Sequence, residues 1–114
     1  MVFPTDQIEA LKKLYPELAA ASEGGTVFIR INKLVLSEPC QPREVVGLLC
    51  PTARDGYPSR LFVSEKVNHS GKVSWNPADG CMILGQQWWA LSWKTRPGQT
   101  LVQMVIDHLG GFQL

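Results

Sequence analysis

The sequence predicts an α+β domain in which an antiparallel meander of about four strands is flanked by helices. The main observation is the order of patterns along the chain: a helical stripe, three or four short apolar strands, an irregular aromatic segment and a capped helix. Strands in succession followed by a helix favour a meander with helices on one side. With 114 residues, 45% of them hydrophobic and 18% charged, the chain suits one globular domain spanning residues 1–114.

The first helix is predicted near the N-terminus, where Thr5 and Asp6 are suitable N-caps. Apolar residues then recur at the spacings of three and four that one buried stripe requires: Ile8, Leu11, Leu14 and Leu18. Pro16 interrupts this stripe, because proline lacks an N–H donor and clashes with the preceding turn. We therefore expect a kink at Tyr15 or a second short helix starting at Pro16, and an end at Gly24-Gly25.

Three strands are predicted next. Residues 26–36 alternate between apolar and polar, but the apolar phase changes halfway, which predicts a bulge near Asn32-Lys33. Residues 45–50 are apolar on both faces, as in a central strand, and residues 61–63 form a third strand. A short fourth strand is expected over residues 72–75.

The final third of the chain contains a turn, an aromatic segment and a helix. The turn over residues 76–80 leads into Cys81, and residues 88–93 suit either a strand or a packed loop. Thr100 and Gln103 have the spacing of a capping box. An apolar helix face follows, made of Leu101, Met104, Val105 and Leu109. Gly110 is the expected C-terminal cap.

Charge and cysteine content restrict the function classes. A formal net charge of +1 without charge blocks argues against bulk nucleic-acid binding. No apolar run is long enough to span a membrane, and no signal peptide is visible at the N-terminus. Three dispersed cysteines indicate free thiols in a reducing, cytoplasmic setting. The cysteine and histidine spacings predict no metal site, and no cofactor motif is present.

Cys81 is the candidate nucleophile, because it leaves a turn and precedes an aliphatic anchor, Met82-Ile83-Leu84. A reactive thiol needs access, a rigid mount and an environment that favours the thiolate. A free cysteine is more often a small buried hydrophobe than a nucleophile, and the local sequence leaves both interpretations open. Cys50 is expected in the core, because it ends an apolar strand.

The histidines and tryptophans have structural interpretations beside functional ones. His69 lies in a predicted turn, where it is either a general base or simply solvated. His108 falls late in the last helix, where a positive charge complements the helix dipole. Trp88, Trp89 and Trp93 suit a domain core, or otherwise a surface that stacks on bases or sugars.

In their order, these pieces resemble ubiquitin-conjugating enzymes, and most closely the divergent bacterial branch of that superfamily. The family has a Tyr-Pro element before its third strand, matched here by Tyr57-Pro58. Its catalytic cysteine follows about two dozen residues later, where Cys81 stands. A Trp, a Pro and a Thr then lead into a helix, as Trp93, Pro97 and Thr100 do here. The resemblance covers about residues 6–109 and rests on order and spacing.

The resemblance implies a conjugating enzyme that carries a ubiquitin-like protein as a thioester on Cys81 and transfers it to a target amine. It also implies an activating enzyme and a JAB-type metallopeptidase as partners, in a gene set of the kind that acts in antiphage defence. The family's His-Pro-Asn triplet is missing, and Asn76 is the nearest candidate for its oxyanion-stabilising asparagine.

Two further interpretations stay open. The chain lacks the triplet and the family's last helices. In this it resembles inactive variants of the fold, which bind ubiquitin-like partners without catalysis. In that case Cys81 is structural and the chain is an adaptor. An unrelated aromatic-rich domain that binds a small ligand or nucleic acid is the third hypothesis, and the near-neutral charge disfavours its nucleic-acid form.

Overall fold

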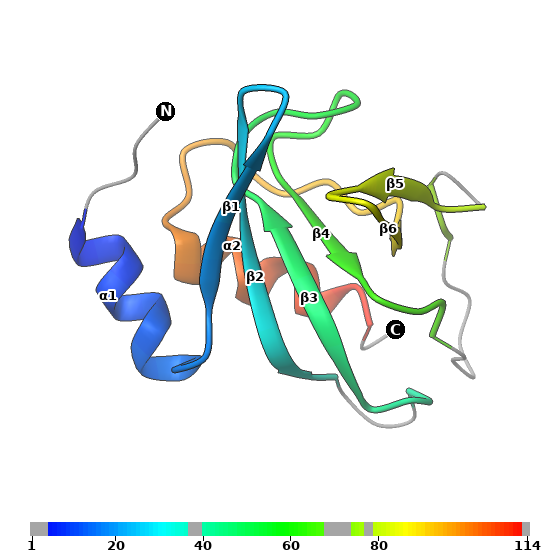
Figure 1. The fold of residues 1–114 in the computed structure, drawn as a ribbon, viewed down its shortest axis with the longest axis horizontal. Coiled ribbons are helices and arrows are strands. Elements are labelled where there is room, and N and C mark those ends of the chain that lie inside the picture. Colours follow the sequence, from blue (N-terminus) through cyan, green and yellow to red (C-terminus); the bar gives the residue numbers. More distant parts are fainter. Residues whose placement is uncertain (1–4, 37–39, 68–73, 77–78, 113–114) are drawn as a thin grey trace.

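A computed structural model of the chain describes residues 5–36, 40–67, 74–76 and 79–112. Six antiparallel strands form one curled sheet in the order β1-β2-β3-β4-β6-β5, a half-barrel with a helix at each end of the chain (Figure 1). The elements are α1 (Thr5–Leu14), β1 (Ala19–Glu23), β2 (Thr26–Val35), β3 (Glu44–Cys50), β4 (Arg60–Val63), β5 (Cys81–Ile83), β6 (Gln86–Ala90) and α2 (Leu101–Gly110). The predicted α+β class is confirmed, and the sheet is larger than the expected meander of about four strands.

The prediction of helix up to Gly24-Gly25 is wrong after Leu14. Pro16 ends α1 instead of kinking it, because its ring cannot join the helical hydrogen-bond ladder. Residues 19–23 form the edge strand β1, in which Ala20 pairs with Ile29 of β2. Gly24 and Gly25 have φ values of 58° and 82°, so they form the hairpin turn between the two strands. Local helical spacing could not reveal this pairing.

The predicted bulge in the second strand is confirmed. The register between β2 and β3 shifts between Ile31 and Leu34, near the expected Asn32-Lys33. The shift lets Ile31 and Leu34, which lie three residues apart, both become buried in one cluster. β3 is buried on both faces, as predicted for a central strand.

Both helices pack on one face of the sheet. Leu11 of α1 and Leu101, Met104 and Val105 of α2 share a core with the residues of β2, β3 and β4 that point to that side. In the view of Figure 1, α2 lies behind the strands. The capping box at the start of α2 is confirmed: Thr100 Oγ1 accepts from Gln103 N, and Gln103 Oε1 accepts from Thr100 N. The helix includes Gly110, and Gly111 caps it in a right-handed conformation.

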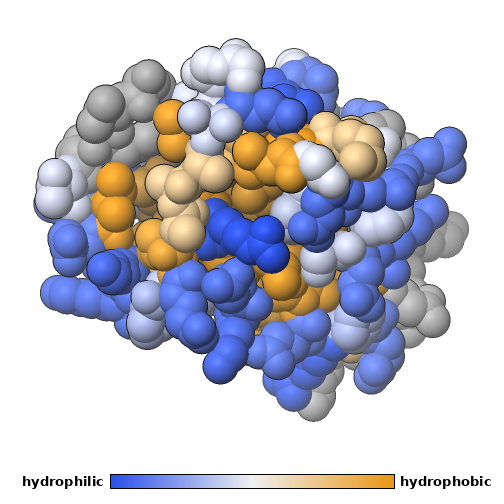
Figure 2. All heavy atoms as spheres, in the orientation of Figure 1, coloured by the Kyte–Doolittle hydropathy of each residue, from blue (hydrophilic) through white to orange (hydrophobic). Residues whose placement is uncertain are grey.

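The opposite face carries a second core that the sequence did not predict. The β5–β6 hairpin folds over this face, and its Ile83 and Trp88 pack against Phe28, Leu48 and Phe62 of the central strands. β6 pairs with β4 through only two residue pairs, which lets the hairpin bend over the sheet. Figure 2 shows hydrophobic side chains near the middle of this face, bordered by hydrophilic ones.

The aromatic segment is mostly structural. Trp88 is 1% exposed, which confirms its core interpretation, while Trp89 and Trp93 are half-buried and pack against the helix-side core. Most of the predicted strand over residues 72–75 lies outside the described residues; Trp75 forms an isolated bridge with Leu91. Among the described residues, neither helix has the length and apolar character that crossing a bilayer requires.

Candidate functional site

Cys81 is the first residue of β5, the strand at the edge of the sheet, and its backbone pairs with Trp88. Its side chain is partly exposed, whereas Cys40 and Cys50 are buried. The preceding Gly80 has φ 79°, and a Cβ atom there would lie 2.6 Å from the Trp88 carbonyl oxygen and 2.9 Å from Trp89 Nε1. A glycine is therefore required at this turn, which holds Cys81 on a rigid mount.

Burial raises the pKa of the Cys81 thiol above its ordinary value. The guanidinium groups of Arg54 and Arg60 oppose this by lowering the pKa. The carboxylate of Asp55 adds to the rise. Burial outweighs the cations, so the thiol is protonated at neutral pH and has two positive charges nearby to stabilise a thiolate once formed.

Arg54 lies between the sheet and the hairpin. Its guanidinium carbon is 5.8 Å from the ring centroid of Phe28 and 5.7 Å from that of Phe62, at cation–π distance. Its buried Nε–H donates no hydrogen bond among the described residues, and the Nε atom lies 3.7 Å from Asp55 Oδ2, at ion-pair distance. The second core thus holds a cation beside Cys81.

A hydrogen-bonded network joins the loop before β4 to the segments at residues 74–76 and 91–92. Arg60 is 1% exposed. Its guanidinium donates hydrogen bonds to Leu91 O (3.0 Å), to Asp55 Oδ2 (3.3 Å) and to Asn76 O. The same group lies over the Tyr57 ring, 4.3 Å from its centroid. Hydrogen bonds of the Tyr57 hydroxyl, first to Ser92 and then to Asn76, lower the pKa of Tyr57. This network fixes the geometry of the loop that also carries Arg54.

Asn76 is the predicted oxyanion stabiliser. Its Nδ2 atom donates to the Tyr57 hydroxyl at 3.0 Å, and among the described residues no hydrogen bond joins it to Cys81. Its role at the thioester therefore stays a prediction. His69, the other weak candidate, lies outside the described residues.

The expectation of a charged His108 at the end of α2 is wrong. Burial lowers the pKa of this imidazole to about 4, so it is neutral at neutral pH. Its Nε2 atom lies 3.0 Å from Ser59 Oγ, which also lies 2.8 Å from Thr95 Oγ1. The helical stripe alone could not show that β4 and the loop at Thr95 enclose this residue.

The sequence interpretation missed Arg54 and Arg60. The sequence could have indicated Arg60, because it lies two residues before Phe62 on the same strand, and residues two apart on a strand point to the same face. Arg54 gave no signal, because its position depends on the fold of the hairpin over the sheet. No group of three metal-ligating side chains occurs within the part of the chain that the structure describes.

Comparison of the chain with protein-family models, with curated proteins and with solved structures found no match. The chemistry of the site therefore rests on its own geometry. That geometry combines a partly exposed thiol on an edge strand, two nearby guanidinium groups and a glycine turn that fixes the thiol's position.

Proposed function

We propose that the chain carries a ubiquitin-like protein as a thioester on Cys81 and passes it to an amine of a target. The observation that supports this most is the difference between the three cysteines. Cys40 and Cys50 are buried, and Cys81 alone is partly exposed, beside the cation of Arg54. A thiol in this setting has access for a large acyl group and a charge that favours its reactive form.

The proposed reaction has two acyl transfers. The Cys81 thiolate attacks the carbonyl carbon of the thioester that links the modifier to its activating enzyme. That enzyme's cysteine leaves as a thiolate and takes up the proton that Cys81 has lost. A target amine then attacks the Cys81 thioester, and Cys81 leaves as a thiolate that receives the proton lost by the amine. Positioning supplies most of the rate in such a scheme.

The edge strand gives the modifier a place to lie. β5 is the last strand of the sheet, and its Met82 is 64% exposed beside Cys81. Leu84, which follows the strand, is 39% exposed. An extended C-terminal tail can pair with a free strand edge and bring its last residue to a side chain on that strand. This supports delivery of the modifier's C-terminus to Cys81.

A non-catalytic binding module is the second candidate. Two observations favour it: burial raises the pKa of Cys81, and the Asn76 amide donates to Tyr57. In this alternative Cys81 packs against the second core, and the β5 edge holds a ubiquitin-like partner without forming a bond to it. Both versions place the chain in the cytoplasm with an activating enzyme and a JAB-type metallopeptidase as partners, in a bacterial antiphage gene set.

A charging assay distinguishes the two. The purified protein is mixed with ATP and with the activating enzyme and ubiquitin-like protein encoded nearest its gene, then run on a gel with and without thiol. We expect a thiol-sensitive adduct that is absent from Cys81→Ala and present in a folded Cys50→Ala control. No adduct, despite a charged activating enzyme and measurable binding of the partners, would select the binding module.

A further inference from the structure

A second site is formed on the helix side of the sheet, between the β3–β4 connection and the loop before α2. It is an open pocket of about 410 Å³, here called the proline pocket, and Pro51, Pro58 and Pro97 contribute to its lining together with Ala53 and Met104. Its volume and apolar lining are those of small-molecule sites. Neither Cys81 nor Arg54 lines it.

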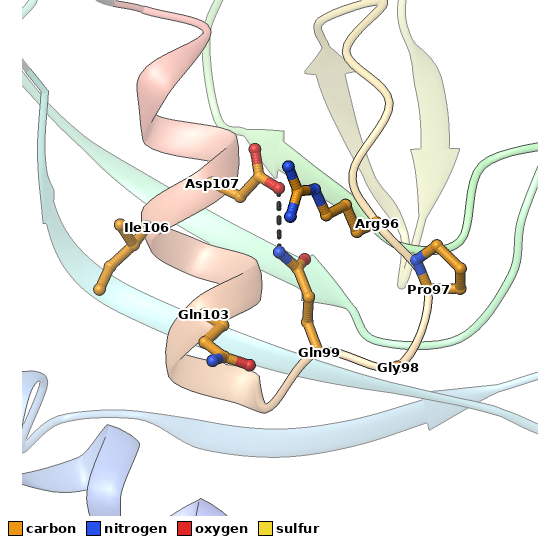
Figure 3. Close-up of a pocket in the computed structure, with 7 residues that line it drawn as sticks. All are labelled: Arg96, Pro97, Gly98, Gln99, Gln103, Ile106 and Asp107. Atoms are coloured by element: carbon orange, nitrogen blue, oxygen red, sulfur yellow. Dashed lines mark hydrogen bonds between the residues drawn. The ribbon is translucent and has the colours of Figure 1, made fainter.

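The side-chain amide of Gln99, which lines this pocket, is oriented by Asp107, which does not line it. The Nε2 atom of Gln99 donates to Asp107 Oδ2 at 3.0 Å, and Asp107 Oδ1 accepts from Trp93 Nε1 at 3.1 Å. An ionised carboxylate only accepts hydrogen bonds, so the amide must turn its nitrogen toward Asp107. Figure 3, a view of the adjoining hollow, shows the amide oxygen on the side of Arg96 and Pro97, which line both hollows.

This fixed orientation leaves an unmet acceptor at the pocket. Gln99 Oε1 is buried, and among the described residues it accepts no hydrogen bond. Rotating the amide would not help, because its oxygen would then face the Asp107 carboxylate. A buried acceptor without a donor is unfavourable, and a ligand that supplies the donor recovers that cost.

The other buried polar groups near the pocket already have partners. The Ser59 hydroxyl, which also lines the pocket, lies 2.8 Å from Thr95 Oγ1 and 3.0 Å from His108 Nε2. Gln99 Oε1 is therefore the group that selects a ligand. We propose that the proline pocket binds a small, mostly apolar molecule that donates one N–H or O–H hydrogen bond to Gln99 Oε1. This site is independent of the thioester chemistry proposed for Cys81.

Indole and N-methylindole test this directly, because they share an apolar ring and only indole has the N–H donor. Each is titrated into the ¹⁵N-labelled full chain, and amide chemical shifts are followed. We expect shifts at Gly98, Gln99 and Ala53, with indole binding about tenfold more tightly than N-methylindole, the preference that one donor to a buried acceptor gives.

Three variants locate the effect. Gln99→Met keeps the side-chain length without the acceptor, so the two probes should bind alike, while Gln87→Met on β6 should keep the preference for indole. Ala53→Phe, at an exposed position on the pocket wall, should block both probes without unfolding the chain. Equal affinity of the two probes for the wild type would overturn the proposal. So would shifts that cluster elsewhere, or no shifts at millimolar concentrations.

Discussion

The Nε2 atom of His108 lies 3.0 Å from the Oγ atom of Ser59, and both residues are buried. This contact joins α2 to the residue that precedes β4. Burial is the main reason that the pKa of His108 falls to about 4; Asp107 partly opposes the fall and Arg60 adds to it. The fold therefore depends on an imidazole that must stay neutral.

Stability should fall as pH is lowered from about 6.5 to about 4. The unfolded His108 binds a proton near pH 6.5, whereas the folded residue does so only near 4, so within this window the unfolded chain binds more protons. The stability that neutral His108 contributes is therefore fully present above about pH 6.5 and lost below about pH 4. We expect His108 to contribute about 3 kcal/mol to the free energy of unfolding, because its pKa is about 4 in the folded chain and about 6.5 in the unfolded chain. Urea unfolding at several pH values across this window measures the loss.

Carboxyl groups also titrate at low pH, so the control is His108→Gln, which can still hydrogen-bond Ser59 but does not titrate. The difference between the wild-type and variant curves should rise through this window and be flat above it. Parallel curves from pH 4 to 7 would contradict a depressed pKa for His108.

Arg60→Met should destabilise the fold strongly. The side chain of Arg60 is 1% exposed, and its guanidinium donates to the carbonyl oxygens of Leu91 and Asn76. Removing it takes this donor away from both carbonyls, at a cost of about 3 kcal/mol in the free energy of unfolding. Asp55→Asn is the matched control. Because Asp55 is 54% exposed, its ion pair with Arg60 should contribute less than about 1 kcal/mol. Equal losses for the two variants would refute this assignment.

Much of the fold was predictable where a local pattern and the tertiary structure agree. The capping box of Thr100 and Gln103 forms as expected, because both of its hydrogen bonds lie within four residues. The bulge between Ile31 and Leu34 was visible as a change of parity, because strand residues alternate strictly between faces. Cys50 is buried as expected for the end of a central strand.

The errors arise where distant segments decide the outcome. Residues 19–23 become a strand only because β2 offers them an edge, and their alanines have no strand preference of their own. The hairpin that carries Cys81 covers a second core, and Arg54 reaches the thiol only through that arrangement. The exposure of Cys81 was likewise beyond any local pattern.

Gly80→Ala should distort the turn that positions Cys81, and Gly56→Ala is its matched control. Both glycines have positive φ, 79° and 85°, so each substitution carries a backbone strain of about 1 kcal/mol. At Gly80 the new Cβ would also meet Trp88 O at 2.6 Å, whereas nothing lies within 4 Å at Gly56. Gly80→Ala should therefore cost about 2 kcal/mol more in urea unfolding, from overpacking against backbone. Similar costs for the two would show that the turn relaxes freely.

Alkylation of the native protein by iodoacetamide should modify Cys81 first, because Cys40 and Cys50 are buried. Arg54→Gln removes a cation that lowers the pKa of this thiol, so the thiolate fraction at pH 8 should fall. The alkylation rate should fall with it, by about threefold to tenfold. Lys12→Gln, an exposed cation on α1, should leave the rate unchanged. Mass spectrometry of the labelled peptides gives the rates. If Cys50 reacted as fast as Cys81, or if Arg54→Gln had no effect, the proposed activation of the thiol by Arg54 would be refuted.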